Sequence, residues 1–290
     1  MTSPREPRPA DSSGAPVTYA RRLGLFSGTM AVIGGIIGSG IFMNPAVVAA
    51  RVGTAPLTLL AWILGGVVAL LGAFIFGELA ARVPRVGGGY AYLRDGFGSL
   101  PAFLYAWALL LIMATGAIAA VAYTFASYAG AVFGLPASSL PYLAAGAIIL
   151  LTALNYVGVR PAAWTQNIFT VLKLAALVVL ILAGMFLSSH AGAGASTGAL
   201  VPVNAAPDIR ALPAPHGFTA VFLALATAFV PVLFAYGGWQ QTNFIAEELV
   251  DPEKNLPRAL VLGVAGVVTI YILANIAYLR TLGVFGLAAS

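Results

Sequence analysis

Seven long apolar stretches constrain what this chain can fold into more than any other feature of its sequence. They run over residues 25–50, 56–82, 101–133, 140–158, 162–187, 217–246 and 259–282. A helix needs about 20 predominantly apolar residues to cross the hydrocarbon core of a bilayer. The pattern therefore predicts an all-α integral membrane protein with seven spans. Its expected surroundings, and hence one of its partners, are the lipids of the bilayer.

Composition excludes the classes of protein that work in water. Hydrophobic residues make up 60% of the 290 residues and charged residues 8%, whereas a soluble domain is about a quarter charged. The sequence has no cysteine and two histidines, both between the fifth and sixth apolar stretches. Neither a thiol nucleophile nor a histidine metal cluster is therefore available within the spans. With no nucleophile–base pair there either, we expect neither an enzyme nor a resident metal or cofactor.

The positive charges indicate how the chain is oriented in the membrane. The net charge is +5, with 14 Lys and Arg residues. With the N-terminus placed in the cytoplasm, ten of them lie on inner segments, three on outer segments and one, Lys173, within a span. Cytoplasmic loops carry such an excess of Lys and Arg. The basic balance therefore predicts a cytoplasmic N-terminus and does not indicate a nucleic-acid partner.

Composition also divides the chain into four parts. Residues 1–23 are rich in Pro, Ser and charge, which predicts a disordered cytoplasmic tail, and they lack the apolar core of a signal peptide. Residues 24–187 hold five spans, and residues 188–216 are expected to form an extracellular loop rich in Gly, Ala and Pro. Residues 217–290 hold two more spans. We expect a first five-helix repeat followed by the first two helices of a second.

Two of the spans contain glycine clusters in their apolar interior. Residues 34–42 of the first span read GGIIGSGIF, and residues 234–241 of the sixth read FAYGGWQQ. Each glycine costs a helix about 1 kcal/mol relative to alanine. Close helix packing through small residues is one explanation. Two clusters at corresponding positions, five spans apart and beside polar residues, favour the other explanation, broken helices that line a transporter site built from inverted repeats.

Breaks of this kind expose backbone groups that bind charged ligands. The half-helix that begins at residues 38–40 directs free N–H groups and a positive dipole end into the cavity, which suits a carboxylate, and Ser39 adds a hydroxyl donor. The half-helix ends near residues 36–37 and 234–235 offer free carbonyls, which suit an ammonium group. Donors and acceptors on opposite sides fit an amino acid zwitterion. No acidic residue lies in the middle of a span, so we expect a neutral substrate side chain.

Lys173 is the basic residue that lies well inside a span. Burying a lysine there costs about 2.5–3.5 kcal/mol on insertion scales, so a functional role is the default hypothesis. Snorkelling toward the interface is the structural alternative, which the distance to both ends of the span disfavours. We expect the ammonium to bind unwound carbonyls in place of a coupling Na⁺. A retinal Schiff base is a weaker alternative, because no intramembrane Asp or Glu would serve as its counter-ion.

Charged and aromatic residues flank the predicted site. Charges surround the glycine-rich loop at residues 86–92, and others follow the sixth span at residues 247–258. They form either a cytoplasmic gate of ion pairs with a re-entrant loop, or an ordinary charged membrane edge. Phe234 and Trp239 flank the break in the sixth span. We interpret them as gate residues, although an aromatic residue in a helix more often serves packing.

Three motifs in this order closely resemble the amino acid–polyamine–organocation transporter superfamily, and within it the L-type amino acid transporters and their bacterial relatives. They are GGIIGSGIF at residues 34–42, GELAARVPRVGGGYAYLRDGFGSLPAFLYAW at 77–107 and FAYGGWQQTNFIAEELVDPEKNLPRAL at 234–260. The resemblance implies an inverted-repeat membrane fold with helices one and six broken. It also implies secondary active transport or exchange of amino acids across the inner (cytoplasmic) membrane.

The resemblance assigns roles to individual residues. It implies that the amides of residues 38–40 bind the substrate carboxylate, and that the carbonyls of Ile36, Phe234 and Gly237 bind its amino group. Phe234 would be an aromatic gate, and Gln240 would border the side-chain pocket. The predicted substrate-binding set is Ile36, Ile37, Gly38, Ser39, Gly40, Ile41, Phe234, Ala235, Tyr236, Gly237, Gly238 and Gln240, with Phe234 and Trp239 as the gate.

The resemblance also bears on coupling and completeness. Lys173 matches a lysine that replaces a sodium site in Na⁺-independent members, which implies alternating access without sodium. The family has twelve helices and this chain seven, so we expect a chain truncated within its second repeat. The alternative function is a transport-incompetent fragment, or a membrane sensor or interaction protein with a residual amino-acid site. Some relatives join a single-span partner through a cysteine, which this cysteine-free chain excludes; a homo-oligomer is left open.

Overall fold

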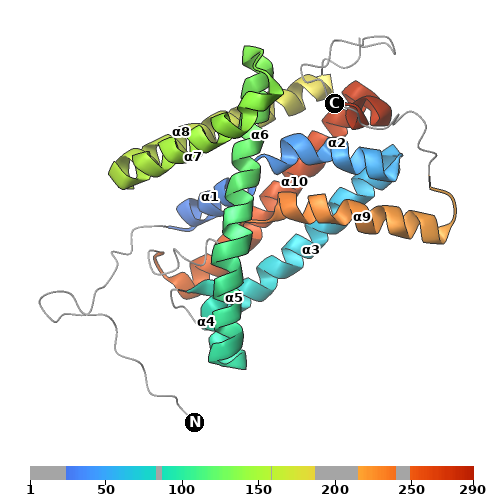
Figure 1. Ribbon diagram of the computed structural model, residues 1–290. Coiled ribbons are helices and arrows are strands. Elements are labelled where there is room, and N and C mark those ends of the chain that lie inside the picture. Colours follow the sequence, from blue (N-terminus) through green and yellow to red (C-terminus); the bar gives the residue numbers. More distant parts are fainter. Residues whose placement is uncertain (1–23, 83–86, 158, 187–214, 240–248) are drawn as a thin grey trace, which may run out of the picture.

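The computed structural model describes residues 24–82, 87–157, 159–186, 215–239 and 249–290 (Figure 1). The secondary-structure elements within these ranges are helices. They are α1 (Leu25–Ile36), α2 (Gly40–Val52), α3 (Ala55–Arg82), α4 (Gly88–Phe97), α5 (Ser99–Ala108), the π-helix η1 (Leu109–Ala114), α6 (Thr115–Phe133), the 3₁₀-helix η2 (Ala137–Ser139), α7 (Leu140–Val157), α8 (Val159–Phe186), α9 (Phe218–Tyr236) and α10 (Pro252–Ala288).

Six helices of the described part are long and apolar enough to cross a membrane, or seven when one bent pair counts as a span. That pair is α1 and α2, which are bent by 48° at a short break. The prediction of an all-α membrane protein with a broken first span is thereby confirmed. α10 begins before the seventh apolar stretch, because Pro252 and Glu253 in its first turn favour a helix start.

Two elements differ from what the sequence pattern indicated. The third span is a continuous rod of 35 residues from Ser99 to Phe133, and its residues Leu109–Ala114 are a π-helix that hydropathy does not reveal. The stretch interpreted as a re-entrant glycine loop at residues 86–92 is helical from Gly88 onward. Gly87 turns the chain at φ +124°, and the tyrosines that follow continue as α4.

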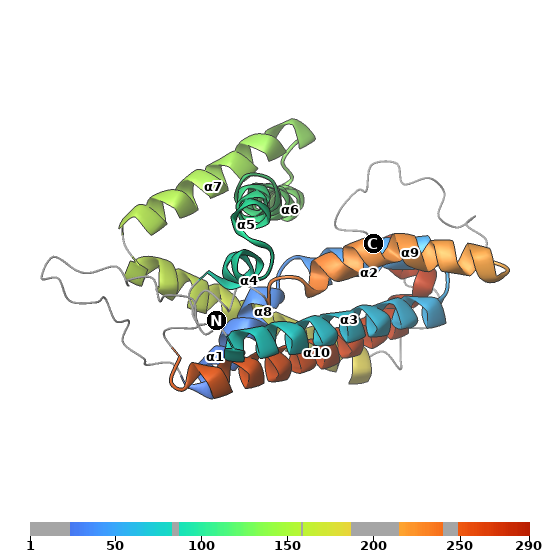
Figure 2. The same cartoon turned by 90° about the horizontal axis from the view of Figure 1, so that it is seen from below.

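α3 and α10 form the centre of the packed core and lie side by side in both views (Figures 1 and 2). Glycines allow their close approach, since a Cβ on Gly66 would lie 2.8 Å from the Val268 side chain and one on Gly77 would lie 3.2 Å from the Pro257 Cα. Small residues bring backbones together at the crossings of membrane helices. These two contacts also show that the helices run antiparallel.

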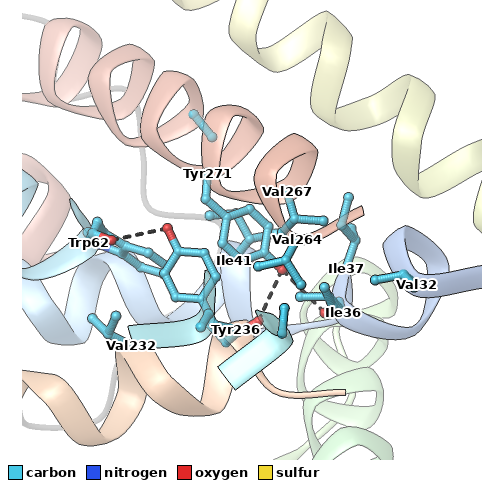
Figure 3. Packing of buried hydrophobic residues seen from close by; sticks show 14 of the residues in the cluster. Val32, Ile36, Ile37, Ile41, Trp62, Val232, Tyr236, Val264, Val267 and Tyr271 are labelled. Atoms are coloured by element: carbon cyan, nitrogen blue, oxygen red, sulfur yellow. Dashed lines mark hydrogen bonds between the residues drawn. The ribbon is translucent and has the colours of Figure 1, made fainter. Parts of the chain in front are cut away.

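The other helices surround this pair. α1, α2 and α8 pack against α10, while α9 packs against α2 and α3. The rod of α5, η1 and α6 lies with α7 to one side of this core (Figure 2). Trp62, Tyr236 and Tyr271 form a fully buried aromatic cluster where α3, α9 and α10 meet (Figure 3). The cluster lies directly beside the break between α1 and α2.

Candidate functional site

The break in the first span leaves a run of carbonyls without their helical donors. In a continuous α-helix the carbonyls of residues 34–37 would accept from amides four residues later. Here α1 ends at Ile36, Ile37 adopts extended backbone angles (φ −68°, ψ 102°), and α2 begins at Gly40. Backbone groups freed at membrane depth need other partners. The structure shows three groups that approach these carbonyls.

Lys173 on α8 is the first of them. Its Nζ donates to the carbonyl of Gly34 at 2.8 Å and also to the carbonyl of Ile37. The side chain is half-buried. The ammonium therefore holds α8 against the break and places a positive charge on two of the freed carbonyls.

Tyr271 on α10 is the second, and sequence reasoning missed it. Its hydroxyl lies 3.3 Å from the carbonyl of Ile36 and 3.2 Å from the carbonyl of Ala235, so one O–H is shared between the ends of α1 and α9 (Figure 3). The side chain is fully buried. The tyrosine is positioned by Trp62 and Tyr236, whose rings lie 5.7 and 5.1 Å from its own. One hydroxyl thus joins the break of the first span to the end of α9.

Gly238 is the third group at the break. Its φ of +110° favours glycine, and a Cβ there would lie 2.3 Å from the carbonyl oxygen of Gly35. The backbone after α9 can therefore lie on the backbone of α1 only with glycine at this position. Gly238 thus has a steric reason that helix propensity alone does not supply.

The start of α2 presents the donors of the site. The Ser39 carbonyl accepts from the amides of Phe42 and Met43 at 3.1 Å each, so the hydrogen-bond ladder begins with those two residues. The amides of residues 38–41 come before it, at the positive end of the helix dipole. Gly38 is exposed and Ser39 is half-buried, and Ser39 makes no side-chain cap to its own helix. This arrangement suits an anionic group.

Gly40 brings the start of α2 onto the end of α9. A Cβ on Gly40 would lie 2.8 Å from the Cα and 2.9 Å from the Cβ of Ala235. Neither atom belongs to a flexible side chain, so the glycine is required for this approach. The positive end of one half-helix therefore lies against the negative, carbonyl end of another.

Two side chains of α2 fasten it to α9 at a proline. Pro231 has no N–H, so the Thr227 carbonyl lacks its usual donor four residues later. Arg51 donates to that carbonyl, and Asn44 Nδ2 donates to the carbonyl of Pro231 at 2.8 Å. α2 and α9 are therefore joined by hydrogen bonds along their length as well as by packing.

The two predicted gate residues lie in different surroundings. Phe234 is 52% exposed, on the last turn of α9. The Trp239 ring packs edge-on against Phe76, with centroids 5.0 Å apart, and Phe76 in turn meets Tyr92 at 5.9 Å. Gly72 makes room for the indole, since a Cβ there would lie 2.7 Å from it. Trp239 is thus held in an aromatic row, whereas Phe234 projects with half its surface exposed.

Most of the predicted substrate-binding set comes together in space. The residues of the first-span break lie against Ala235, Tyr236 and Gly238, with Lys173 on the adjoining carbonyls. Gln240 lies outside the described residues. Of the predicted charged gate, Arg82 Nη2 pairs with Glu78 at 2.7 Å on an exposed surface of α3, and residues 83–86 and 240–248 lie outside the described ranges.

No group of three or more metal-ligating side chains occurs among the residues that the structure describes. The site is instead built from backbone groups of three helix ends, one lysine and one tyrosine. Such a site can hold a small molecule that carries both a carboxylate and an ammonium.

The sequence matches one family model and several known proteins over most of its length. The family model described as "Amino acid permease" matches residues 23–285. The chain is 38% identical to the large neutral amino acids transporter small subunit 2 of Rattus norvegicus, covering 97% of this chain and 51% of that protein. It is 35% identical to the b(0,+)-type amino acid transporter 1 of Mus musculus, covering 89% of this chain and 51% of that protein. The chain thus spans about half the length of these curated relatives, which are transporters and not enzymes.

Proposed function

This chain belongs to the amino acid permease family, and from that premise we propose that it contains the substrate site of a secondary transporter. The transporter moves or exchanges neutral amino acids by Na⁺-independent alternating access. The observation that carries the proposal is the contact between Gly40 at the start of α2 and Ala235 at the end of α9. Because these ends have opposite partial charges, they are suited to the two charged groups of one amino acid.

We assign the carboxylate to the start of α2 and the amino group to the opposite carbonyls. The amides of residues 38–41 and the Ser39 hydroxyl donate to the carboxylate. The carbonyls of Phe234, Gly237 and Ile36 accept from the ammonium. The Phe234 carbonyl also accepts from the Gly237 amide at 3.2 Å, but a carbonyl has two lone pairs and can accept twice.

The substrate's side chain and its gate follow from the same arrangement. Phe234 closes over the bound amino acid, Trp239 borders the gate, and Gln240 borders the side-chain pocket. The described residues beside the breaks include no carboxylate that would bind a cationic side chain. Neutral side chains are therefore the proposed substrates.

Sodium independence rests on Lys173. Its ammonium already lies on the carbonyls of Gly34 and Ile37. Backbone oxygens of an unwound helix are the ligands that a coupling Na⁺ uses in broken-helix transporters. A fixed positive charge at these oxygens removes the need for that ion.

Orientation and assembly complete the proposal. The excess of basic residues on the segments placed inside supports a cytoplasmic N-terminus, and the resemblance to bacterial relatives supports the inner membrane. We assign residues 24–187 to the first repeat and residues 217–290 to the start of the second; of the external loop expected at 188–216, residues 188–214 lie outside the described residues. These residues contain no cysteine, so any partner bound to this part of the protein is held without a disulfide from it.

The test is exchange of radiolabelled amino acids in proteoliposomes, with Na⁺ or choline as the external cation. The protein is the full natural polypeptide that contains these residues, run beside the 290-residue chain. We expect uptake of leucine, little uptake of glutamate or arginine, and the same rate in choline as in Na⁺. A steep Na⁺ dependence would contradict the proposal that Lys173 takes the place of a coupling Na⁺. Binding without flux in both preparations would favour a sensor or a transport-incompetent protein.

A further inference from the structure

Two buried polar atoms in the interface of α3 and α10 have no hydrogen-bond partner among the described residues. They are Nε1 of Trp62, which is a donor, and Oδ1 of Asn275, which is an acceptor. Both side chains are 0% exposed. Nearly all buried polar groups in native proteins are paired with protein or with ordered water, so each of these atoms requires a partner.

The register of the two helices places Trp62 and Asn275 within one turn of each other along the interface. Gly66 faces Val268, and Gly77 faces Pro257. The same number of residues separates these two contacts on α3 and on α10, counted in opposite directions. Continued toward the other end, this register places Asn275 opposite the turn of α3 that runs from Thr58 to Trp62. Asn275 also lies one turn after Tyr271, whose ring meets Trp62 edge-on at 5.7 Å.

The neighbouring polar side chains each donate one hydrogen bond within their own helices. Asn275 Nδ2 donates to the Tyr271 carbonyl at 2.8 Å, and the hydroxyl of Thr58 donates to the Thr54 carbonyl at 2.8 Å. Thr58 is also fully buried, and its oxygen can still accept. A molecule that lies between these side chains must therefore accept a hydrogen bond from Trp62 and donate one to Asn275. It can donate a hydrogen bond to Thr58 as well.

We propose that α3 and α10 bind one buried water molecule between Trp62 and Asn275. Water both accepts and donates, and buried waters typically make about three hydrogen bonds. The positive end of the indole N–H opposes a bare cation, and the Asn275 oxygen opposes an anion. The water joins the two helices on the turn beside Tyr271, whose hydroxyl bonds to the ends of α1 and α9. This site is independent of which substrate the protein carries.

The experiment follows the Trp62 indole by NMR in detergent, using the full natural polypeptide labelled with ¹⁵N at tryptophan. The Trp62 signal is assigned by its loss in Trp62→Phe, which removes the N–H and keeps a ring. We expect a cross-peak between the indole proton and a long-lived water. The cross-peak should be lost in Asn275→Leu and kept in Asn155→Leu. Asn155 is the matched control because its Nδ2 makes the same bond to the carbonyl four residues earlier, but on an exposed surface.

Each outcome decides the proposal. A Trp62 indole without a water cross-peak in the unchanged protein would overturn it, and so would a cross-peak that persists in Asn275→Leu. A Trp62 signal that shifts on titration with NaCl but not with choline chloride would show that a cation, and not a water molecule, occupies this position. If Asn275→Leu does not insert, the cross-peak in the unchanged protein still decides, because Trp62→Phe identifies it.

Discussion

Tyr271 joins the break of the first span to the end of α9. Its hydroxyl is the donor shared by the carbonyls of Ile36 and Ala235. Replacing it with phenylalanine keeps the ring and leaves two buried carbonyls with one donor fewer, which costs about 1–3 kcal/mol. We expect Tyr271→Phe to lower the melting temperature in detergent and to reduce exchange in proteoliposomes severalfold.

The control for that substitution is Tyr142→Phe. Tyr142 is 80% exposed on α7, so loss of its hydroxyl should change neither quantity. Equal effects of both substitutions, or no effect of Tyr271→Phe, would show that the shared hydroxyl does not hold the breaks.

Two neighbouring glycines of the first break should respond differently to alanine. At Gly40 a methyl group would collide with the backbone of Ala235, whereas at Gly38 the nearest atom lies 3.9 Å away, on the Ile36 carbonyl. We therefore expect Gly40→Ala to separate α2 from α9 and to lower thermal stability by about 1–3 kcal/mol. Gly38→Ala should leave stability unchanged and weaken amino acid binding, because its methyl group lies beside the proposed carboxylate site.

Thermal unfolding and equilibrium binding of radiolabelled leucine distinguish these two effects. Unchanged binding in a stable Gly38→Ala protein would place the carboxylate elsewhere. A Gly40→Ala protein as stable as the unchanged one would show that the close approach to Ala235 is not required.

For single residues, the sequence predicted those whose role is visible in the local composition of the chain. Glycine clusters mark both breaks, and Lys173 is conspicuous because a charge in an apolar span is costly. Tyr271, Asn44 and Arg51 carry no such signal, because their roles depend on carbonyls of other helices, which lie between 36 and 235 residues away in the sequence. Only the packed structure shows which carbonyls need a donor.

At the scale of elements, α2 and α9 form a pair that is joined at Pro231. The proline removes the donor to the Thr227 carbonyl, and Arg51 replaces it. In Pro231→Ala the alanine N–H can donate to Thr227 within its own helix, so Arg51 should matter less there. We expect Arg51→Leu to destabilise the unchanged protein but to have little effect in Pro231→Ala, a coupling of about 1 kcal/mol.

A double-mutant cycle on thermal unfolding measures this coupling. The cycle of Arg51→Leu with Thr281→Val serves as the control, because Thr281 bonds within α10 to the carbonyl of Ala277. Strictly additive effects in the first cycle would show that Arg51 does not replace the donor that Pro231 lacks.

Hydropathy predicted the spans well, because a bilayer imposes both the length and the composition of a helix. Ends and interruptions were predicted less well. The π-helix at Leu109–Ala114 lies in a uniformly apolar run, where nothing in the composition changes. The helix that begins at Gly88 was not predicted, because the glycines that turn the chain at its start indicated a loop.

At the scale of the whole molecule, the described helices divide into a packed core and an outer group. The core of α1, α2, α3, α9 and α10 encloses the breaks, and α8 reaches it through Lys173. The most apolar part of the α5–α6 rod is 0% buried, so it presents its side chains to lipid or to other parts of the protein. This division places the proposed site inside the part of the chain with the tightest packing.

In the proposed site, opposed helix ends bind the two charged groups of one amino acid. The most direct test is competition for binding of radiolabelled leucine by analogues that lack one of these groups. Unlabelled leucine should displace the label, whereas 3-methylbutylamine, which lacks the carboxylate, and 4-methylpentanoate, which lacks the amino group, should compete at least tenfold more weakly. If either analogue competes as well as leucine, one of the two helix ends does not contribute to binding and the account is wrong.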